Sequence, residues 1–96
     1  MSFGILIDGS QTQSGDPEWV TRFDPDVHAP GVPYPTGDGA CSLDPRQALR
    51  FATIDDAFAF WRQRSTVTPT RPDGRPNRPL TVFMVTFPEV PEVDRG

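Results

Sequence analysis

The chain has 96 residues, a hydrophobic content of 35% and a formal net charge of −4 at pH 7. This length suits one domain, and an acidic chain is a poor general binder of nucleic acid because phosphate contacts need positive charge. No apolar run approaches the roughly 20 residues of a membrane helix, and the N-terminus lacks the basic start of a secretory signal, so we expect neither.

Charge is distributed unevenly along the sequence. All nine basic residues are arginine, and there is no lysine. Residues 1–61 carry nine acids and three arginines, whereas residues 62–78 carry five arginines and one acid. This pattern predicts an acidic body with one cationic segment, and an acidic surface is suited to contact with a basic protein surface.

The N-terminal part predicts two short strands separated by a polar loop. Residues 3–7 (FGILI) are apolar and end in a turn signal, and residues 9–17 predict a flexible loop. Residues 19–23 (WVTRF) predict the second strand, in which Trp19 and Phe23 share one face.

The next segment is irregular. Residues 24–42 contain four prolines and three glycines and predict a long flexible loop, which is either functional or mobile. Asp44 and Pro45 then predict an N-cap followed by proline at the first helical position, which starts a single turn over residues 45–49.

The main helix is expected over residues 54–64. Thr53 is a suitable N-cap, and Asp56 lies three residues further on as a capping-box partner. Four apolar residues share one helical stripe: Ile54, Ala57, Phe58 and Trp61. We expect Phe58 and Trp61 to be the main contribution of the helix to the core.

The C-terminal part predicts a loop, a strand and a tail. Residues 66–79, the Arg/Pro loop, contain a turn signal at Asp73-Gly74. Residues 80–87 predict a strand that is apolar on both faces, so we expect it either to lie in the centre of the sheet or to contact a partner through its second face. Residues 88–96 are expected to form a loose tail.

These elements together predict a single α+β domain over residues 1–96. Its expected architecture is a small antiparallel sheet of three to four strands with one main α-helix packed on it.

Nine charged residues are the candidate partner-binding residues: Asp16, Glu18, Asp24, Asp26, Asp38, Asp44, Arg71, Arg75 and Arg78. The acids form either a solvated surface or a surface that imitates nucleic acid towards a basic partner. The arginines either bind carboxylate or phosphate groups of a partner or fold back on acids of the same chain. The Arg/Pro loop has no aromatic residue on which bases could stack, so we expect no direct binding of nucleic acid.

No catalytic or metal-binding motif is recognisable. His28 and Cys41 are the only histidine and cysteine, and no thiol-enzyme motif flanks them. The spacing of the acids fits no calcium-binding loop. We therefore expect no enzyme activity, no cofactor and no metal. Trp19 and Trp61 are expected in the core, although an exposed tryptophan would indicate an interface.

A motif in the middle of the chain resembles a known group of proteins. The run DP-x-x-A-L-R-F from Asp44 to Phe51, followed by Thr53 and a helix that contains Ala57, resembles a pattern in small uncharacterised proteins of phages and prophages. The segment PDGRPNRPLT from Pro72 to Thr81 is similar to part of the same group. The resemblance covers roughly residues 43–87 and does not extend to residues 24–42.

This resemblance implies a mobile-element origin. Small acidic phage proteins often act by binding a host protein, and inhibitors of CRISPR–Cas complexes are one such class. By this analogy we expect a cytoplasmic protein of the bacterial host cell, a monomer or weak homodimer, that binds and inhibits or modulates a host protein or protein–nucleic acid complex with a basic surface. The alternative is a structural or accessory phage protein that self-associates through Leu80, Val82 and Met84.

Overall fold

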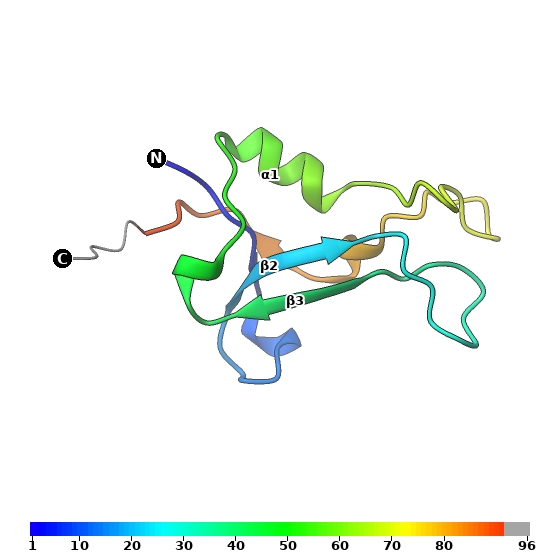
Figure 1. Ribbon diagram of the computed structural model, residues 1–96, viewed down its shortest axis with the longest axis horizontal. Helices are drawn as coiled ribbons and strands as arrows, with labels where there is room; N and C mark the ends of the chain where they lie inside the picture. Colours follow the sequence, from blue (N-terminus) through cyan, green and yellow to red (C-terminus); the bar gives the residue numbers. More distant parts are fainter. Residues whose placement is uncertain (92–96) are drawn as a thin grey trace.

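A four-stranded antiparallel sheet and one main helix form the structure, a computed structural model that describes residues 1–91. The strands are β1 (Leu6–Ile7), β2 (Glu18–Asp24), β3 (Asp38–Ser42) and β4 (Val85–Thr86), in the spatial order β3-β2-β1-β4. The helix α1 (Ile54–Trp61) lies over one face of the sheet (Figure 1). Three short 3-10 helices are η1 (Gly9–Gln11), η2 (Pro45–Gln47) and η3 (Pro79–Val82). The predicted α+β class is confirmed.

The N-terminal segment, rather than the predicted strand 80–87, forms the centre of the sheet. β1 pairs with β2 on one side and with β4 on the other. The pairing with β4 continues beyond the strands, because the Val90 N–H donates to the Ser2 carbonyl at 2.8 Å. Val90 is only 1% exposed. The expectation of a loose tail is therefore wrong for the residues up to Val90, and residues 92–96 lie outside the described part.

The two faces of the sheet carry separate apolar clusters. The cluster beneath α1 consists of Ile5, Ile7, Val20, Ala57 and Leu80. The cluster on the opposite face consists of Trp19, Ala48 and Val90. Because side chains alternate along a strand, β1 and β2 contribute to both clusters. The second face is thus covered by the turn at η2 and by the C-terminal segment.

A β-bulge in β2 changes the predicted side-chain alternation. The register with β3 shifts between Val20 and Arg22, which inserts an extra residue into β2. As a result, Phe23 packs against the same cluster as Val20, while Trp19 belongs to the opposite cluster. The expectation that Trp19 and Phe23 share a face is wrong.

The predicted loop over residues 24–42 ends in a strand that the sequence did not indicate. Residues 38–42 (DGACS) form β3 and pair with β2. Gly39 makes this pairing possible, because a Cβ atom there would lie 2.6 Å from the Arg22 carbonyl oxygen. Because β3 is short and contains a glycine, its sequence lacks the alternating apolar pattern by which a strand is predicted.

The predicted strand over residues 80–87 is mostly not a strand. Pro79 begins η3, and the Thr81 N–H and hydroxyl both donate to the Arg78 carbonyl. Proline fixes its backbone and lacks an N–H, which favours the first position of a helical turn over a ladder. Consequently Leu80 is buried, whereas Val82 is 69% exposed.

The start of α1 and the turn before it follow the predicted capping. The Thr53 hydroxyl accepts a hydrogen bond from the Asp56 N–H at 3.1 Å. The Asp44 carboxylate accepts one from the Arg46 N–H at 2.9 Å and begins η2. Both N-caps are confirmed.

The helix ends three residues earlier than expected, at Trp61, so Arg62 and Arg64 are not in its last turn. The Gln63 N–H donates to Phe60, and the Ser65 N–H donates to the Asn77 carbonyl at 2.9 Å. The chain after Trp61 therefore forms hydrogen bonds with the Arg/Pro loop in place of further helical hydrogen bonds.

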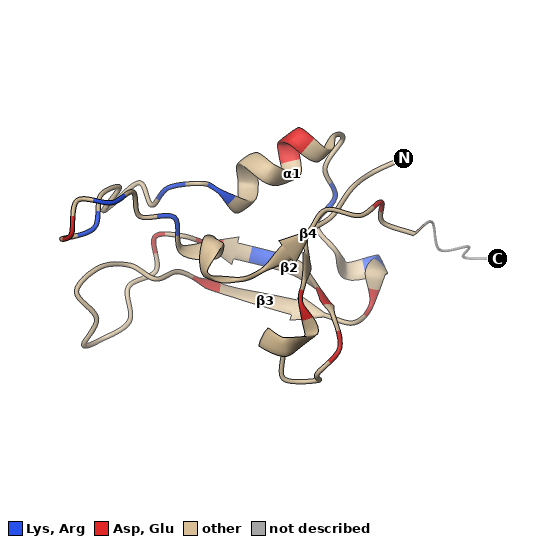
Figure 2. Ribbon diagram, turned by 180° about the vertical axis from the view of Figure 1, so that it is seen from behind, with Lys and Arg blue, Asp and Glu red and all other residues tan. Residues whose placement is uncertain are grey.

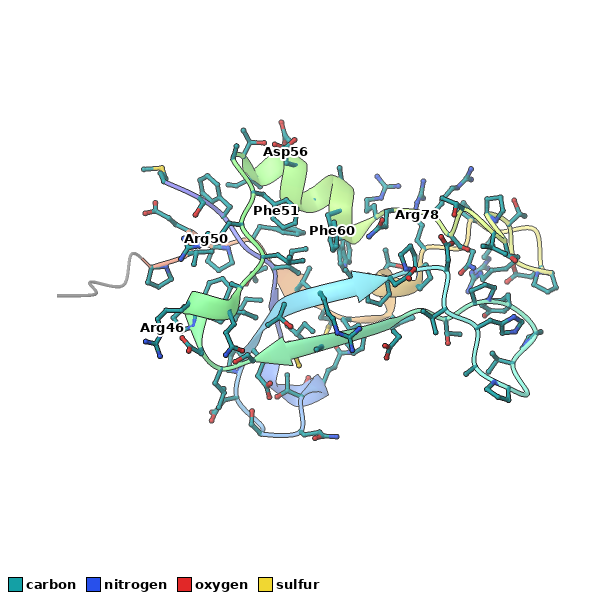
Figure 3. The ribbon with its side chains drawn as sticks, viewed as in Figure 1. Arg46, Arg50, Phe51, Asp56, Phe60 and Arg78 are labelled. Carbon is teal, nitrogen blue, oxygen red and sulfur yellow. The ribbon has the colours of Figure 1, made fainter. Side chains whose placement is uncertain are left out.

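The buried face of α1 also differs from the predicted stripe. Ala57 is fully buried, whereas Ile54 is 49% and Phe58 40% exposed. Phe60 lies between α1 and the sheet, 5.3 Å from Phe51 between ring centroids (Figure 3). The expectation that Phe58 is a main core residue is wrong.

The segment between β2 and β3 and the Arg/Pro loop extend together from the end of the molecule farthest from the N-terminus (Figure 1). The buried Asn77 side chain donates to the Pro35 and Thr68 carbonyls, each at 3.0 Å. Its backbone N–H donates to the Pro69 carbonyl at 2.9 Å. These bonds tie the two loops to each other and give both a defined position.

Candidate functional site

A group of apolar side chains, two exposed and two half-buried, runs along α1 and onto the segment after β4. We call it the aromatic ridge, and it consists of Ile54, Phe58, Trp61 and Phe87. The Phe58 ring centroid lies 5.7 Å from Trp61 and 5.8 Å from Phe87, and the rings of Trp61 and Phe87 are 6.0 Å apart. Aromatic rings that form tilted or edge-to-face pairs at these distances attract each other and stabilise the packing.

The aromatic ridge is held in place near the C-terminal end of α1. Trp61 is half-buried, and its indole N–H donates to the Phe83 carbonyl at 3.3 Å. The Arg62 guanidinium lies 5.4 Å from the Phe58 ring centroid, within the range of a cation–π contact. Aromatic and arginine side chains of this kind are frequent hot spots of protein interfaces. Trp61 packs against the core cluster beneath α1, as expected, and only part of its side chain remains exposed.

Three arginines gather beyond the end of α1. We call Arg62, Arg64 and Arg78 the arginine cluster. Desolvation lowers the pKa of Arg78, and the nearby charges of Arg62 and Arg64 lower it further. Within residues 1–91, no acid lies at ion-pair distance from any of the three. The sequence separates Arg78 from the other two, so only the folded loop reveals the cluster.

The arginines are more concentrated in space than the acids. Figure 2 shows blue segments along the stretch after α1 and on the Arg/Pro loop, with further blue on β2 and η2, whereas red segments are spread over the start of α1, β3, the tip of the Arg/Pro loop and the chain near η1. Figure 3 places Arg78 near the end of α1.

The three predicted arginines of the Arg/Pro loop have different environments. Arg71 lies 5.9 Å from the Tyr34 ring centroid and 3.7 Å from a carboxylate oxygen of Asp73. Arg75 is exposed at the turn, where its backbone N–H donates to Asp73 at 3.0 Å. Arg71 and Arg78 line a common cavity, and Arg75 does not.

Asp26, a candidate partner-binding acid, is bound within its own chain. Its carboxylate accepts hydrogen bonds from the Ser65 hydroxyl, from the N–H and hydroxyl of Thr66, and from the Val67 N–H. Hydrogen bonds from Thr66 and then Ser65 lower the pKa of Asp26 to about 2. Asp26 therefore fastens one loop to the other, and its acceptor sites are not free for a partner.

Three further candidate acids have local partners. Asp38 forms an ion pair with Arg22 at 3.1 Å, and the Asp24 carboxylate accepts a hydrogen bond from the Asp26 N–H at 2.9 Å. Asp44 forms an ion pair with Arg46 at 3.1 Å, and hydrogen bonds from Arg46 lower the Asp44 pKa.

The remaining two acids, Asp16 and Glu18, lie near η1. Glu18 accepts a hydrogen bond from the Ser14 hydroxyl at 2.7 Å, and this bond lowers the Glu18 pKa. The Asp16 carboxylate accepts no hydrogen bond within the described residues. The six acids are thus spread over several places and do not form one surface.

An open groove of about 430 Å³ lies beside Glu18, between η1, the β2–β3 hairpin and η3. Its floor includes Val20 and Leu80, and Cys41 lies at its rim. Burial, followed by hydrogen bonding to Glu18, raises the pKa of the Cys41 thiol. A raised pKa disfavours the thiolate, which is the reactive form of cysteine.

His28 is bonded locally, because its ring Nε2 lies 2.5 Å from the Val32 carbonyl oxygen. Among residues 1–91, no three His, Cys, Asp or Glu side chains gather in a way that could hold a metal ion. In the same residues, α1 is far too short to cross a membrane, and no other helix could do so.

Comparison of the chain with protein-family models, with curated proteins and with solved structures finds no match. The function must therefore be argued from the surfaces described above.

Proposed function

We propose that this chain is a small binding protein, not an enzyme, that docks on a host macromolecular complex and inhibits or modulates it. The observation that carries the proposal is the aromatic ridge. Ile54 and Phe58 are 49% and 40% exposed on a short helix, beside the half-buried Trp61. Burial of such side chains in a partner removes apolar area from water at about 25 cal/mol per Å².

The charges beside the aromatic ridge indicate the chemistry of the partner. Arg62 and Arg64 follow α1 directly and have no ion-pair partner within the described residues. A partner surface that covers the ridge would therefore be apolar with an acidic rim. Asp16 and Glu18 lie elsewhere on the chain and suit a basic patch of the same complex, so binding is expected to be stoichiometric and sensitive to salt.

The resemblance to small phage and prophage proteins suggests the kind of complex. We propose a host defence complex of the bacterial cytoplasm, of which a Cas complex is the leading candidate, blocked by steric and electrostatic contact. The test is an interference assay in which cells express the chain while a Cas complex targets a resident plasmid. Plasmid retention above that of cells without the chain supports the proposal, and equal loss in both contradicts inhibition of that complex.

A second candidate function is self-association at the sheet edge. It is favoured by β4, which pairs with no further strand among the described residues, and by Val82 and Met84, which are 69% and 60% exposed. The buried Leu80 cannot take part, contrary to expectation. The Gln11 side chain also bonds the Val82 carbonyl and the Met84 N–H, which fixes this edge within the chain. Light scattering distinguishes the two functions: a monomer favours the host-binding protein, and a stable homo-oligomer favours self-association.

A further inference from the structure

A small cavity lies where the two long loops meet η3. It has a volume of about 150 Å³. Its lining includes Thr36, Arg71, Pro76, Asn77, Arg78 and Thr81. Sites for drug-sized ligands usually measure about 300–1,000 Å³, so this cavity suits a chemical group of a few atoms. No residue of the aromatic ridge lines it.

Two incompletely satisfied cations face this cavity. The Nε atoms of Arg71 and Arg78 are buried and have no hydrogen-bond partner within residues 1–91. A buried donor without an acceptor is costly, and each such group in a folded protein needs an explanation. Both guanidinium groups have lost part of their hydration, and an anion at their terminal nitrogens would compensate for this loss.

The surrounding charge also favours an anion. Arg78 belongs to the arginine cluster, whose mutual repulsion is not offset by an acid at ion-pair distance in the described chain. The nearest acid to Arg71 is Asp73, which lies at the long distance of 3.7 Å and is 55% exposed. The residues that line the cavity include two arginines and no acid, which favours a dianion over a monoanion.

The walls of the cavity are held in place before any ligand binds. Asn77 is 2% exposed and bonds both neighbouring loops. The Thr81 hydroxyl bonds the Arg78 carbonyl at 2.7 Å, and Pro76 and Pro79 fix the backbone on each side. A preorganised site avoids the entropy loss of ordering its groups on binding.

We propose that this cavity is an oxyanion site that binds a phosphate group, with the guanidinium groups of Arg71 and Arg78 as its main ligands. Guanidinium binds phosphate in a bidentate manner through its planar set of donors. Thr36 also lines the cavity, and its hydroxyl is a potential further donor. The phosphate could be free or part of a phosphomonoester, since both present the same oxygens. The site does not depend on the aromatic ridge or on the proposed function.

The proposal is tested by titrating the full chain with inorganic phosphate, O-phosphoserine and acetate at constant ionic strength. Binding is followed by NMR of the arginine Nε–H signals, because donors shielded from water exchange slowly. We expect saturable shifts at Arg71 and Arg78 with both phosphates, and binding of acetate that is weaker by about tenfold or more. If O-phosphoserine binds as tightly as inorganic phosphate, the site accepts phosphomonoesters. If only inorganic phosphate binds, the site is specific for the free ion. Acetate binding as tightly as phosphate would overturn the assignment.

Variants locate the site. Arg78→Gln and, separately, Arg71→Gln should each weaken phosphate binding by about tenfold or more. Arg75→Gln is the matched control, because Arg75 lies on the same loop, is exposed and does not line the cavity. An equal loss in Arg75→Gln, or no saturation with the wild-type chain, contradicts the proposal. A thermal melt confirms that each variant folds. If Arg78→Gln does not fold, the phosphate affinity of Arg71→Gln alone tests the proposal.

Discussion

Asp26 shows how strongly a single carboxylate can organise this small protein. It accepts hydrogen bonds from three consecutive residues that begin at Ser65, about forty positions away in sequence. Those residues lie four to six positions beyond Trp61, the last residue of α1, so Asp26 fixes the position of the chain where the Arg/Pro loop begins. Nothing local to Asp26 indicates these partners, and sequence reasoning therefore placed it on a binding surface.

Replacing this carboxylate should destabilise the fold in a pH-dependent way. The Asp26 pKa is lowered from 3.8 to about 2 in the folded chain. Its stabilising effect is fully present above the unfolded value and is lost as pH falls towards about 2. Asp26→Asn should therefore lower the free energy of unfolding at pH 7, and the difference from wild type should shrink between pH about 4 and about 2.

Urea unfolding at a series of pH values measures this effect. The control is Asp16→Asn, which removes an exposed carboxylate that accepts no hydrogen bond in the described chain. A loss of stability in the Asp16 variant as large as in the Asp26 variant would refute the role assigned to Asp26.

At the scale of elements, α1 depends on its N-cap because it has only eight residues. Thr53→Ala removes the acceptor for the Asp56 N–H and should lower the free energy of unfolding by about 1 kcal/mol. Thr53→Ser keeps the hydroxyl and should retain most of the stability. The measurement is chemical denaturation followed by circular dichroism, and an alanine variant as stable as wild type would contradict the capping assignment.

The β2–β3 hairpin depends on close packing of glycine against Phe23. Gly37 has φ +81°, and a Cβ atom there would overlap the Phe23 ring. Gly31 has a similar φ of +86° but open space around it. Both Gly→Ala variants carry a backbone strain of roughly 1–2 kcal/mol, and only Gly37→Ala adds a clash.

Thermal melts of these two variants isolate the clash. We expect a lower melting temperature for Gly37→Ala than for Gly31→Ala. Equal melting temperatures would mean that Phe23 does not pack against this turn.

The elements that the sequence predicted correctly are those with local signals. Thr53 and Asp44 act through neighbouring residues, and the apolar run FGILI and the segment WVTRF identify β1 and β2. The errors arise where distant contacts decide the outcome. β3 exists because β2 offers it a pairing edge, and residues 62–64 leave α1 because Asn77 and Asp26 bind the chain just beyond them.

The candidate site was less predictable for the same reason. The sequence indicated that Arg71, Arg75 and Arg78 form a cationic segment, but not that Arg62 and Arg64 join Arg78. The aromatic ridge was interpreted as core, because a helical stripe does not show which side of it the rest of the chain covers.

At the scale of the whole molecule, the protein presents three distinct surfaces around one small sheet. The aromatic ridge lies along α1, the arginine cluster and its cavity lie beyond the end of α1, and the acids near η1 lie apart from both. This separation allows a partner to be recognised by apolar contact and by charge at the same time. Arg62 joins two of these surfaces, because it belongs to the arginine cluster and its guanidinium lies over the Phe58 ring of the aromatic ridge.

The central claim is that the aromatic ridge binds a host partner. The most direct test compares recovery of partners from a bacterial host lysate at low salt by the wild-type chain, by Phe58→Asp and by Leu43→Asp. Leu43 is 56% exposed and lies outside the ridge, so its variant controls for adding the same charge at an exposed apolar position.

We predict that wild type and Leu43→Asp recover the same partner in stoichiometric amount. Phe58→Asp should weaken that binding about thirtyfold, the effect of losing a hot-spot residue worth about 2 kcal/mol. Equal recovery by all three chains, or no partner with the wild-type chain, would contradict the account.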